Sequence, residues 1–364
     1  MLERWVYMLE FISNRTSDFN VGNFVNELAD ASKKLGILEA KIDAYQFNSI
    51  LIPMLQKKEA VSSMYIEGTQ TTISEVLRNE AIPQSEDDMI QREVTNHTRT
   101  LIYGAEHLRS GRFTHTFIKE LHLRMMDGII EPGLEDTLGK YKIEDNQIRS
   151  TIGTVVYNPP SAKDTKKYMD ELLSFMNGSD DGLNPLIKAG LIHSQFESIH
   201  PFSDGNGRIG RVLISLYLYK AGVINVPFFY ISEAINQDKS VYYNMLTDSR
   251  TNSLDKWLGY FLRKVSVQAT KLIGYIDTLN DLYTKTKNIV KTYINSPKYD
   301  EIIECLFTQP VLTATNLENE LSVSHGQAVR YLNVLETNHV LLGDDRKRGR
   351  TFYFTELIDL ANGA

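Results

Sequence analysis

Twelve consecutive residues, His200–Arg211 (HPFSDGNGRIGR), combine a proton acceptor, a carboxylate and two arginines with paired glycines. The imidazole of His200 titrates near neutrality and can act as a general base. Gly205 and Gly207 allow a sharp turn in which successive backbone N–H groups converge on phosphate oxygens. The segment therefore predicts an anion-binding site beside a general base.

The apolar run Ile209–Tyr219 predicts a buried helix that follows this turn. The N-terminus of a helix favours negative charge, which suits phosphate binding. Arg208 and Arg211 are three residues apart, so they are neighbours on the first helical turn and can each fork onto phosphate oxygens. Asp204 is a hard oxygen ligand suited to Mg²⁺; its alternative role is to cap the helix.

The same glycines form a misleading pattern. Gly205, Gly207 and Gly210 satisfy the G-x-G-x-x-G fingerprint of dinucleotide-binding folds. That fingerprint requires a preceding apolar strand, whereas His200–Asp204 precedes it here and Pro201 disfavours strand pairing. The sequence therefore argues against a Rossmann fold, and it contains no P-loop motif.

The segment resembles the Fic family motif, H-x-F-x-[DE]-G-N-G-R-x-x-R, at every defined position of His200–Arg211. The preceding His193-x-x-Phe196-Glu197-x-Ile199 is similar to the core helix of that family. Fic proteins mostly transfer AMP from ATP to a hydroxyl of a target protein and release pyrophosphate. The resemblance extends from about residue 20 to about residue 265.

The resemblance implies a role for each motif residue. His200 would be the catalytic base, and Asp204 would hold Mg²⁺ on the phosphates of ATP. Tyr242 and Tyr243 lie in a segment similar to the family's adenine pocket, although tyrosines on a helix are more often core residues. Phe202 and His193 are interpreted as core residues. The remaining nucleotide-binding residues would be Gly205, Asn206, Gly207, Arg208, Ile209, Gly210 and Arg211.

A second motif lies in the N-terminal part. Ser63 and Glu67 are four residues apart, hence on one helix face, and Gly68 suits the end of that helix. The pattern resembles the inhibitory motif [ST]-x-x-x-E-[GN] of many Fic proteins, whose glutamate pairs with the second motif arginine, here Arg211. The alternative is a surface acid at a helix end. Thr72 or Ser74 is expected to cap a following helix that begins near Glu75.

Residues Leu138–Pro160 are rich in residues typical of strands, and Gly153 predicts a turn. In Fic proteins this position holds a hairpin flap that pairs with the backbone of the target protein. The flap residues would be Val155, Val156 and Tyr157. The alternative is an ordinary hairpin packed on helices.

The C-terminal segment has its own pattern. Three helices are predicted over 300–307, 314–321 and 324–337, followed by strands at 340–342 and 351–354 around the basic turn 346–350. This order is typical of a winged helix-turn-helix domain, which often binds DNA. Residues 298–364 contain six Lys and Arg against ten Asp and Glu, however. Protein contact or dimerisation is therefore at least as well supported as DNA binding.

Composition fits a soluble enzyme. The chain has 364 residues and a net charge of −7, which argues against broad nonspecific nucleic-acid binding. Cys305 is the single cysteine, which excludes an internal disulfide and agrees with a reducing compartment. No apolar run of membrane-spanning length and no signal peptide are present, so we expect a cytoplasmic protein without membrane contact.

The expected fold is mainly α-helical, with a Fic-type core, a β-hairpin flap and a C-terminal winged helix-turn-helix domain. The expected domains are an N-terminal helical segment (1–85), the Fic core (86–265), a helical linker (266–297) and the winged helix (298–364). Before 85, helical periodicity is expected over Val25–Ile52, with a stop near Pro53.

The leading functional prediction is a protein adenylyltransferase that uses ATP and Mg²⁺ and is autoinhibited by Glu67. Removal of AMP from a modified target, with Glu67 orienting a water, is a subsidiary activity. The alternative is a DNA-binding regulator that senses nucleotide through the Fic core. The sequence leaves the target protein, its modified side chain and the oligomeric state open, and a homodimer is one option.

Overall fold

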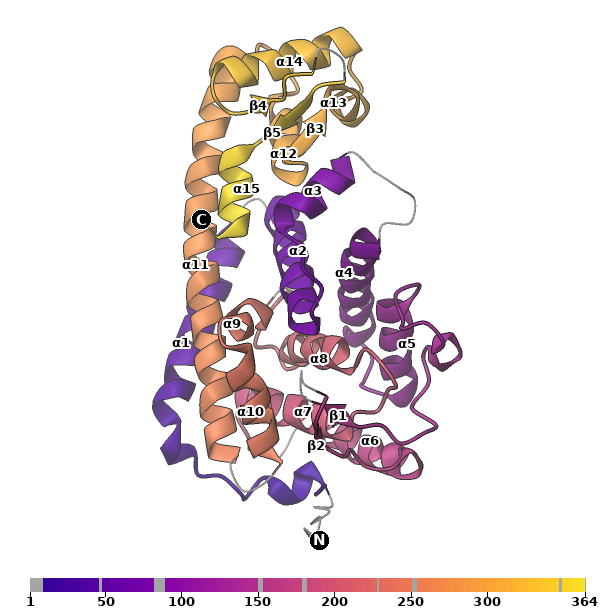
Figure 1. The fold of residues 1–364 in the computed structure, drawn as a ribbon. Coiled ribbons are helices and arrows are strands. Elements are labelled where there is room, and N and C mark those ends of the chain that lie inside the picture. Colours follow the sequence, from indigo (N-terminus) through magenta and orange to yellow (C-terminus); the bar gives the residue numbers. More distant parts are fainter. Residues whose placement is uncertain are drawn as a thin grey trace. The chain divides into compact units, whose positions relative to one another are not determined.

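A computed structural model describes residues 9–45, 48–81, 89–149, 153–178, 182–227, 229–250, 254–346 and 349–363. Residues 150–152 of the predicted hairpin, and Lys347 and Arg348 of the predicted basic turn, lie outside these ranges. The described chain is mainly helical with small antiparallel sheets, as predicted (Figure 1). It divides into two compact units: Met1–Glu39, Ser62–Gly68 and Thr95–Thr270 form the first, and Ala40–Val61, Thr69–Val94 and Lys271–Ala364 form the second.

The first unit contains the anion-site motif and consists mostly of helices (Figure 1). Its regular elements, some of which continue into the other unit, are η1 (Ile12–Arg15), η2 (Val21–Asn23), α1 (Val25–Ala44), α4 (Met89–Leu108), α5 (His115–Met126), η3 (Glu135–Thr137), β1 (Ile148–Arg149), β2 (Val155–Tyr157), α6 (Ala162–Asn177), α7 (Pro185–Ile199), α8 (Asn206–Lys220), α9 (Ser232–Asn236), α10 (Lys239–Ser249) and α11 (Leu254–Tyr293).

Helix α7 lies in the core of the first unit. All of its residues from Leu186 to Ile199 are buried, including polar ones such as His193 and Glu197. Its start follows from Asn184, whose side chain accepts a hydrogen bond from the Leu186 N–H, and from Pro185 at the first helical position. Helix α8 packs against α7. The loop between these two buried helices carries the motif.

The predicted stop at Pro53 is wrong. Helix α2 (Asn48–Glu67) includes this proline near its N-terminal end. A proline there removes the hydrogen bond to the carbonyl four residues earlier. That carbonyl belongs to Ser49, which is exposed, so water can replace the missing donor. The helix therefore continues to Glu67.

Helix α3 (Ile73–Ala81) follows and begins two residues before the predicted start. Its cap is Thr72, which is one of the two residues predicted as possible caps. The Thr72 hydroxyl accepts from the Glu75 N–H at 3.2 Å, and the Glu75 carboxylate accepts from the Thr72 N–H at 2.9 Å. This reciprocal pair is a capping box, which explains why the helix starts here.

Two predicted domain boundaries do not coincide with breaks in the structure. Helix α11 runs through 40 residues without interruption, so the boundary at residue 265 lies inside it. Buried apolar residues recur three or four positions apart across that point, from Leu262 through Val265 and Ala269 to Leu272, and this spacing favours one continuous helix. The predicted N-terminal segment 1–85 is divided between both units.

The C-terminal part of the second unit contains the three predicted helices, α12 (Tyr299–Thr308), α13 (Ala314–Leu321) and α14 (His325–Thr337). Capping boxes at Thr313 and Ser324 fix the starts of the last two. The strands β3 (Val311–Thr313), β4 (Leu342–Gly343) and β5 (Thr351–Tyr353) form an antiparallel sheet in the order β3-β5-β4, and α15 (Thr355–Asn362) follows. Strand β3 was not predicted from the sequence, because a three-residue strand has too few positions to show alternation. Helix α15 was not predicted either.

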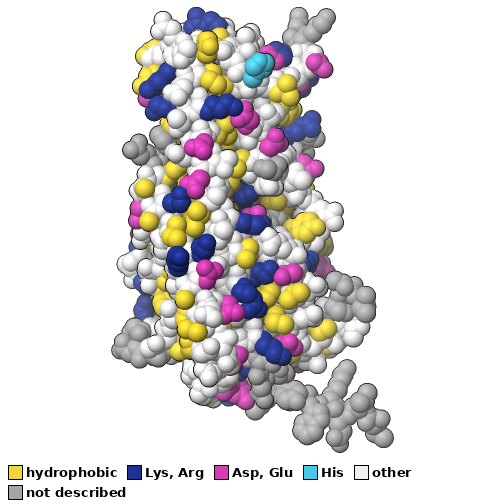
Figure 2. All heavy atoms as spheres, turned by 90° about the vertical axis from the view of Figure 1, so that its left-hand side faces the viewer, with side chains coloured by type: hydrophobic (Ala, Val, Ile, Leu, Met, Phe, Trp, Pro, Cys, Tyr) yellow, Lys and Arg dark blue, Asp and Glu magenta, His cyan; other side chains and the backbone are white. Residues whose placement is uncertain are grey.

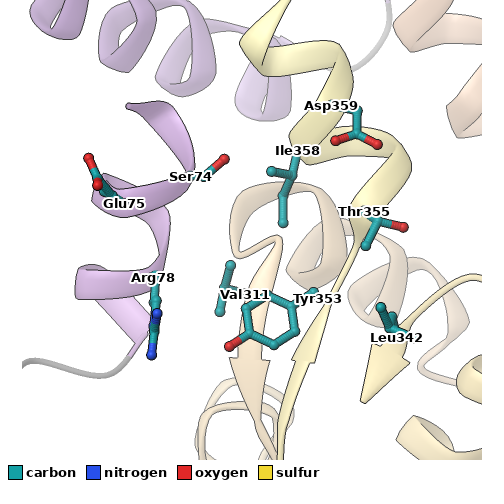
Figure 3. A pocket seen from close by; sticks show the side chains of 9 residues that line it. All are labelled: Ser74, Glu75, Arg78, Val311, Leu342, Tyr353, Thr355, Ile358 and Asp359. Carbon is teal, nitrogen blue, oxygen red and sulfur yellow. The ribbon is translucent and has the colours of Figure 1, made fainter. Parts of the chain in front are cut away.

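Within the second unit, α3 packs against β3 and α15. Together these elements line a pocket of about 330 Å³ (Figure 3). Its rim carries charges of both signs, with Glu75 and Arg78 on α3 and Asp359 on α15. The single cysteine, Cys305, is buried in α12, and burial raises the pKa of its thiol to about 12.

The surface charge is mixed. On the face shown in Figure 2, Lys and Arg side chains are interspersed with Asp and Glu side chains. Among the helices of the described residues, none is both long and apolar enough to cross a membrane.

Candidate active site

The motif forms the connection between α7 and α8. His200 ends α7 in the left-handed region (φ 49°, ψ 60°), and its N–H donates to the Phe196 carbonyl at 2.9 Å. Gly205, with φ 77°, is the N-cap of α8, so the helix begins three residues earlier than the predicted apolar run. A Cβ at Gly205 would lie 2.6 Å from Met126 Sδ. Glycine is therefore needed here for both conformation and space.

The side chain of Asn206 holds the loop closed. Its Oδ1 accepts from the Phe202 N–H and its Nδ2 donates to the Phe202 carbonyl, both at 2.8 Å. Asn206 is 2% exposed. The resemblance assigned this residue to phosphate contact, but in this structure both polar atoms of its side chain serve the loop. What it can offer an anion is its backbone at the start of α8.

Phe202 is fully buried, as predicted for a core anchor. It stacks on His122 with ring centroids 3.9 Å apart. His122 Nδ1 accepts from the Gly139 N–H at 3.1 Å, which leaves Nε2 as the protonated nitrogen that donates to the Asp204 carbonyl at 3.0 Å. Burial lowers the pKa of His122 to about 4, so this neutral form persists at pH 7. Nothing in the sequence around His122 distinguishes it from a core residue of a helix. The sequence therefore does not predict its contact with the motif loop.

His200 is half-buried, and its Nδ1 has no hydrogen-bond partner among the residues that the structure describes. Burial, followed by the positive charges of Lys142 and Arg250, lowers the pKa of His200 to about 4. The imidazole is therefore neutral at pH 7. A neutral imidazole has one unprotonated nitrogen and is able to accept a proton.

The ion pair expected from the resemblance to the inhibitory motif is present. Arg211 Nη2 lies 2.6 Å from Glu67 Oε1, and Arg211 Nε donates to Ser63 Oγ at 3.0 Å. The side chain of Arg211 is 2% exposed and that of Glu67 is 31% exposed. Gly68 follows Glu67 with φ 104° and ends the helix, as predicted.

The carboxylate of Glu67 lies over the first turn of α8. A Cβ at Gly207 would be only 2.5 Å from Glu67 Oε1. Burial opposes ionisation of Glu67, but the guanidinium groups of Arg211 and Arg208 outweigh it and lower the pKa of this carboxyl. An anion thus already occupies the helix N-terminus between the two motif arginines.

Asp204 does not cap α8, because Gly205 occupies the cap position. Its Oδ1 accepts from the Gly205 N–H at 2.6 Å and its Oδ2 accepts from the Glu131 N–H at 3.2 Å. No group of three or more His, Cys, Asp or Glu is arranged for a metal within the described ranges. A lone carboxylate beside an anion site suits Mg²⁺, which commonly takes one or two carboxylates and completes its shell with phosphates and water.

Tyr242 was expected near the nucleotide base, and the structure places it in the core instead. It is 1% exposed, and its hydroxyl lies 2.8 Å from His193 Nε2. His193 Nδ1 lies 3.1 Å from the Gly210 carbonyl, which confirms a hydrogen-bonded core histidine. Ile209 is fully buried as well. His193 on α7 thus contacts both the Gly210 carbonyl of α8 and the Tyr242 hydroxyl of α10.

Tyr243 is 42% exposed, and its hydroxyl donates to the Ile66 carbonyl at 3.3 Å. Its ring therefore lies beside the end of α2, next to Glu67. Of the two tyrosines, Tyr243 is the one whose ring can meet a ligand.

The predicted hairpin is present. Strands β1 and β2 are antiparallel, with Ile148 opposite Tyr157 and Arg149 opposite Val155, and Gly153 turns with φ 80°. Each strand pairs only with the other within the described residues, so an outer edge remains on each. Val156 is 45% exposed.

The sequence was compared with known families and structures. A profile of the Fic/DOC family matches residues 112–218, and a profile described as Fic/DOC family N-terminal matches residues 25–106. A protein adenylyltransferase Fic of Nematostella vectensis is 28% identical over 150 residues, and a probable protein adenylyltransferase of Aquifex aeolicus is 25% identical over 153 residues. These alignments cover 41% and 42% of this chain but only 34% and 40% of those relatives.

The fold has a counterpart in solved structures. The crystal structure of a Fic family protein from Desulfovibrio desulfuricans aligns with a TM-score of 0.59 over 92% of this chain and 97% of that one, at 18% identity. The two family profiles together match more than half of the 364 residues. Residues 112–218 therefore match the Fic/DOC family, and residues 25–106 match the region that precedes it in that family.

Proposed function

We propose that this protein is an autoinhibited protein adenylyltransferase, which moves AMP from ATP to a hydroxyl of a target protein or of itself. One observation carries the proposal: the carboxylate of Glu67 pairs with Arg211 and lies over the first turn of α8, directly after the loop that begins at His200. The names of the relatives support the same class of reaction.

The chemistry assigned to the loop is an in-line displacement. A Ser, Thr or Tyr oxygen forms a bond to the α-phosphorus while the bond to the bridging oxygen of the β-phosphate breaks, and pyrophosphate leaves. The neutral imidazole of His200 takes the hydroxyl proton. The N-terminus of α8 and Arg208 stabilise the charge that develops on the phosphate oxygens. Asp204 would hold Mg²⁺, which when bound neutralises part of the charge of the triphosphate.

Inhibition follows from the Glu67–Arg211 pair. Arg211 is engaged by Glu67 and Ser63, so a γ-phosphate that enters the site meets a carboxylate in place of a free guanidinium. ATP then binds with its α-phosphorus out of line with the attacking oxygen. Misalignment of this kind lowers rates by orders of magnitude. The same glutamate could orient a water for removal of AMP, as a subsidiary activity.

The test is incorporation of labelled AMP with Mg²⁺-ATP, followed by mass spectrometry of the intact protein. Glu67→Gly should raise incorporation at least tenfold over the unsubstituted protein. Glu67→Gly combined with Arg211→Ala should not, because the γ-phosphate then lacks its guanidinium. Equal incorporation in the unsubstituted protein and Glu67→Gly would contradict autoinhibition.

For residues 298–364 we propose a winged helix-turn-helix domain that contacts protein more readily than DNA. Its turn contains two described arginines that are both in ion pairs, Arg346 with Asp344 and Arg350 with Glu336. Pairing of this kind reduces their availability to phosphates of a nucleic acid. These pairs argue against the DNA-binding alternative.

A further inference from the structure

We propose that Lys142 and Asn146 are positioning residues that fix the backbone of His200 relative to the flap. The proposal concerns two polar residues of the segment between α5 and β1, outside the motif. Its kinetic consequence rests on the proposed adenylyl transfer, whereas its structural consequence does not.

The two residues engage four consecutive carbonyls around the base. The Lys142 backbone N–H donates to the Pro201 carbonyl at 2.8 Å, and Lys142 Nζ donates to the Ile199 carbonyl at 3.2 Å. Asn146 Nδ2 donates to the carbonyls of His200 at 3.1 Å and of Phe202 at 3.0 Å. Every carbonyl from residue 199 to residue 202 therefore accepts from one of these two residues.

The pair is also internally connected and largely removed from water. Lys142 Nζ donates to Asn146 Oδ1 at 2.7 Å, which orients the amide so that its Nδ2 faces the loop. Lys142 is 3% exposed. A buried ammonium is costly unless its donors are satisfied. This one has acceptors from both the amide and the end of α7, so it is built into the site.

We call Lys142 and Asn146 together the clamp. The backbone conformation of His200 explains why it is needed. A non-glycine residue in the left-handed region is strained and persists only where the surroundings impose it. His200 has φ 49°. The direction of its imidazole depends on that backbone, because the turn at His200 ends α7 and starts the motif loop. Loss of the clamp should therefore let the His200 imidazole change its position, while the residue itself remains present.

The clamp also joins the base to the flap. Asn146 lies two residues before β1. At the other strand, the Arg250 guanidinium lies 4.2 Å from the centre of the Tyr157 ring, and Arg250 Nε donates to Ser198 Oγ near the end of α7 at 3.2 Å. Both flap strands are thus tied to the end of α7 that carries His200. A target segment docked on the flap would be held in register with the proton acceptor.

The experiment compares Asn146→Ala and the nearly isosteric Asn146→Asp, each in the Glu67→Gly background. Aspartate keeps an acceptor for Lys142 but cannot donate to the two carbonyls, so both variants should behave alike. Asn158→Ala is the matched control, because this exposed asparagine follows the other flap strand, β2, and its side chain accepts from Gln147 Nε2 at 3.1 Å. Three quantities are measured: kcat of AMP transfer, Kd of Mg²⁺-ATP, and the NMR signal of the His200 ring, assigned with His200→Ala.

In both Asn146 variants we expect kcat to fall about ten- to a hundredfold, since a misplacement of about 1 Å can cost that much. Kd should stay within about twofold, the His200 signal should shift or broaden, and the Asn158 control should match its parent. An unchanged kcat, or a Kd that weakens as much as kcat/KM, would overturn the proposal.

The NMR arm separates the clamp from the proposed reaction. If Glu67→Gly itself transfers no AMP, the proposed function fails, and the His200 signal alone decides the clamp. A signal that is the same in the parent and in the soluble, folded Asn146→Asp variant would refute it.

Discussion

At the scale of single residues, the surroundings of the site reinforce the neutral form of the base and the ionised form of the inhibitory acid. His200 is kept neutral by burial and by nearby cations, and its pKa is lowered to about 4. Glu67 is kept ionised by Arg211 and Arg208 despite burial. Nearby cations thus favour both the neutral base and the ionised acid, although different cations act on the two groups.

The base can be tested alone. In the Glu67→Gly background, His200→Ala should lower AMP transfer about a hundredfold or more, because the group proposed to take the hydroxyl proton is then missing. ATP affinity, measured by calorimetry with Mg²⁺, should change little, since the anion site is built from α8 and the arginines. Transfer at the parental rate would remove His200 from the mechanism.

At the scale of elements, the start of α8 decides whether the anion site exists. Gly205→Ala should destabilise the protein by about 1–2 kcal/mol for the left-handed conformation, with a further loss from the contact with Met126 Sδ. Mg²⁺-ATP binding should weaken with it. The measurement is thermal unfolding together with ATP titration.

The control for that substitution lies just past the C-terminal end of the same helix. Gly222 follows α8 with φ 71°, and a Cβ there would meet no atom within 4 Å. Gly222→Ala should show the conformational cost alone and leave ATP binding intact. Equal effects of the two substitutions on ATP affinity would contradict a special role for Gly205.

The elements also show how far sequence reasoning reaches. The motif loop, the hairpin and the end of α2 at Gly68 could be predicted, because glycines and local spacing determine them. The core position of Tyr242 could not be predicted, because it depends on which face of α10 meets α7. The contacts of Lys142 and Asn146 with the motif loop could not be predicted either, since the residues that they contact lie 54 to 59 positions away in sequence.

At the scale of the whole molecule, buried histidines make stability depend on pH. Burial lowers the pKa of His97, His122 and His193 to about 3, 4 and 3. Their unfolded values are near 6.5. Below that pH the unfolded state binds protons that the folded state does not, so stability falls as the pH falls. Glu197 opposes this, because burial raises its pKa to about 7 and the folded state keeps its proton.

The pKa of His200 is also lowered to about 4, so four histidines oppose one glutamate. The balance is about three protons, which corresponds to a loss of roughly 4 kcal/mol per pH unit between about pH 6 and pH 4.5. Urea unfolding at several pH values measures it. His97→Leu should reduce the slope by about a third without breaking a hydrogen bond, since neither ring nitrogen of His97 has a partner among the described residues. Stability that is constant from pH 7 to pH 5 would contradict the burial of these histidines.

The place of Glu67 in its helix has a consequence for regulation. It is the last residue of α2, and Gly68 follows it in the left-handed region. Ends of helices fray, and opening of a final turn is a local event that costs far less than global unfolding. Basal activity would then be proportional to the fraction of time that this turn is open. That fraction falls about tenfold for each 1.4 kcal/mol of free energy that favours the closed turn. An activating partner would need to capture only one turn of helix, which a contact of peptide size can do.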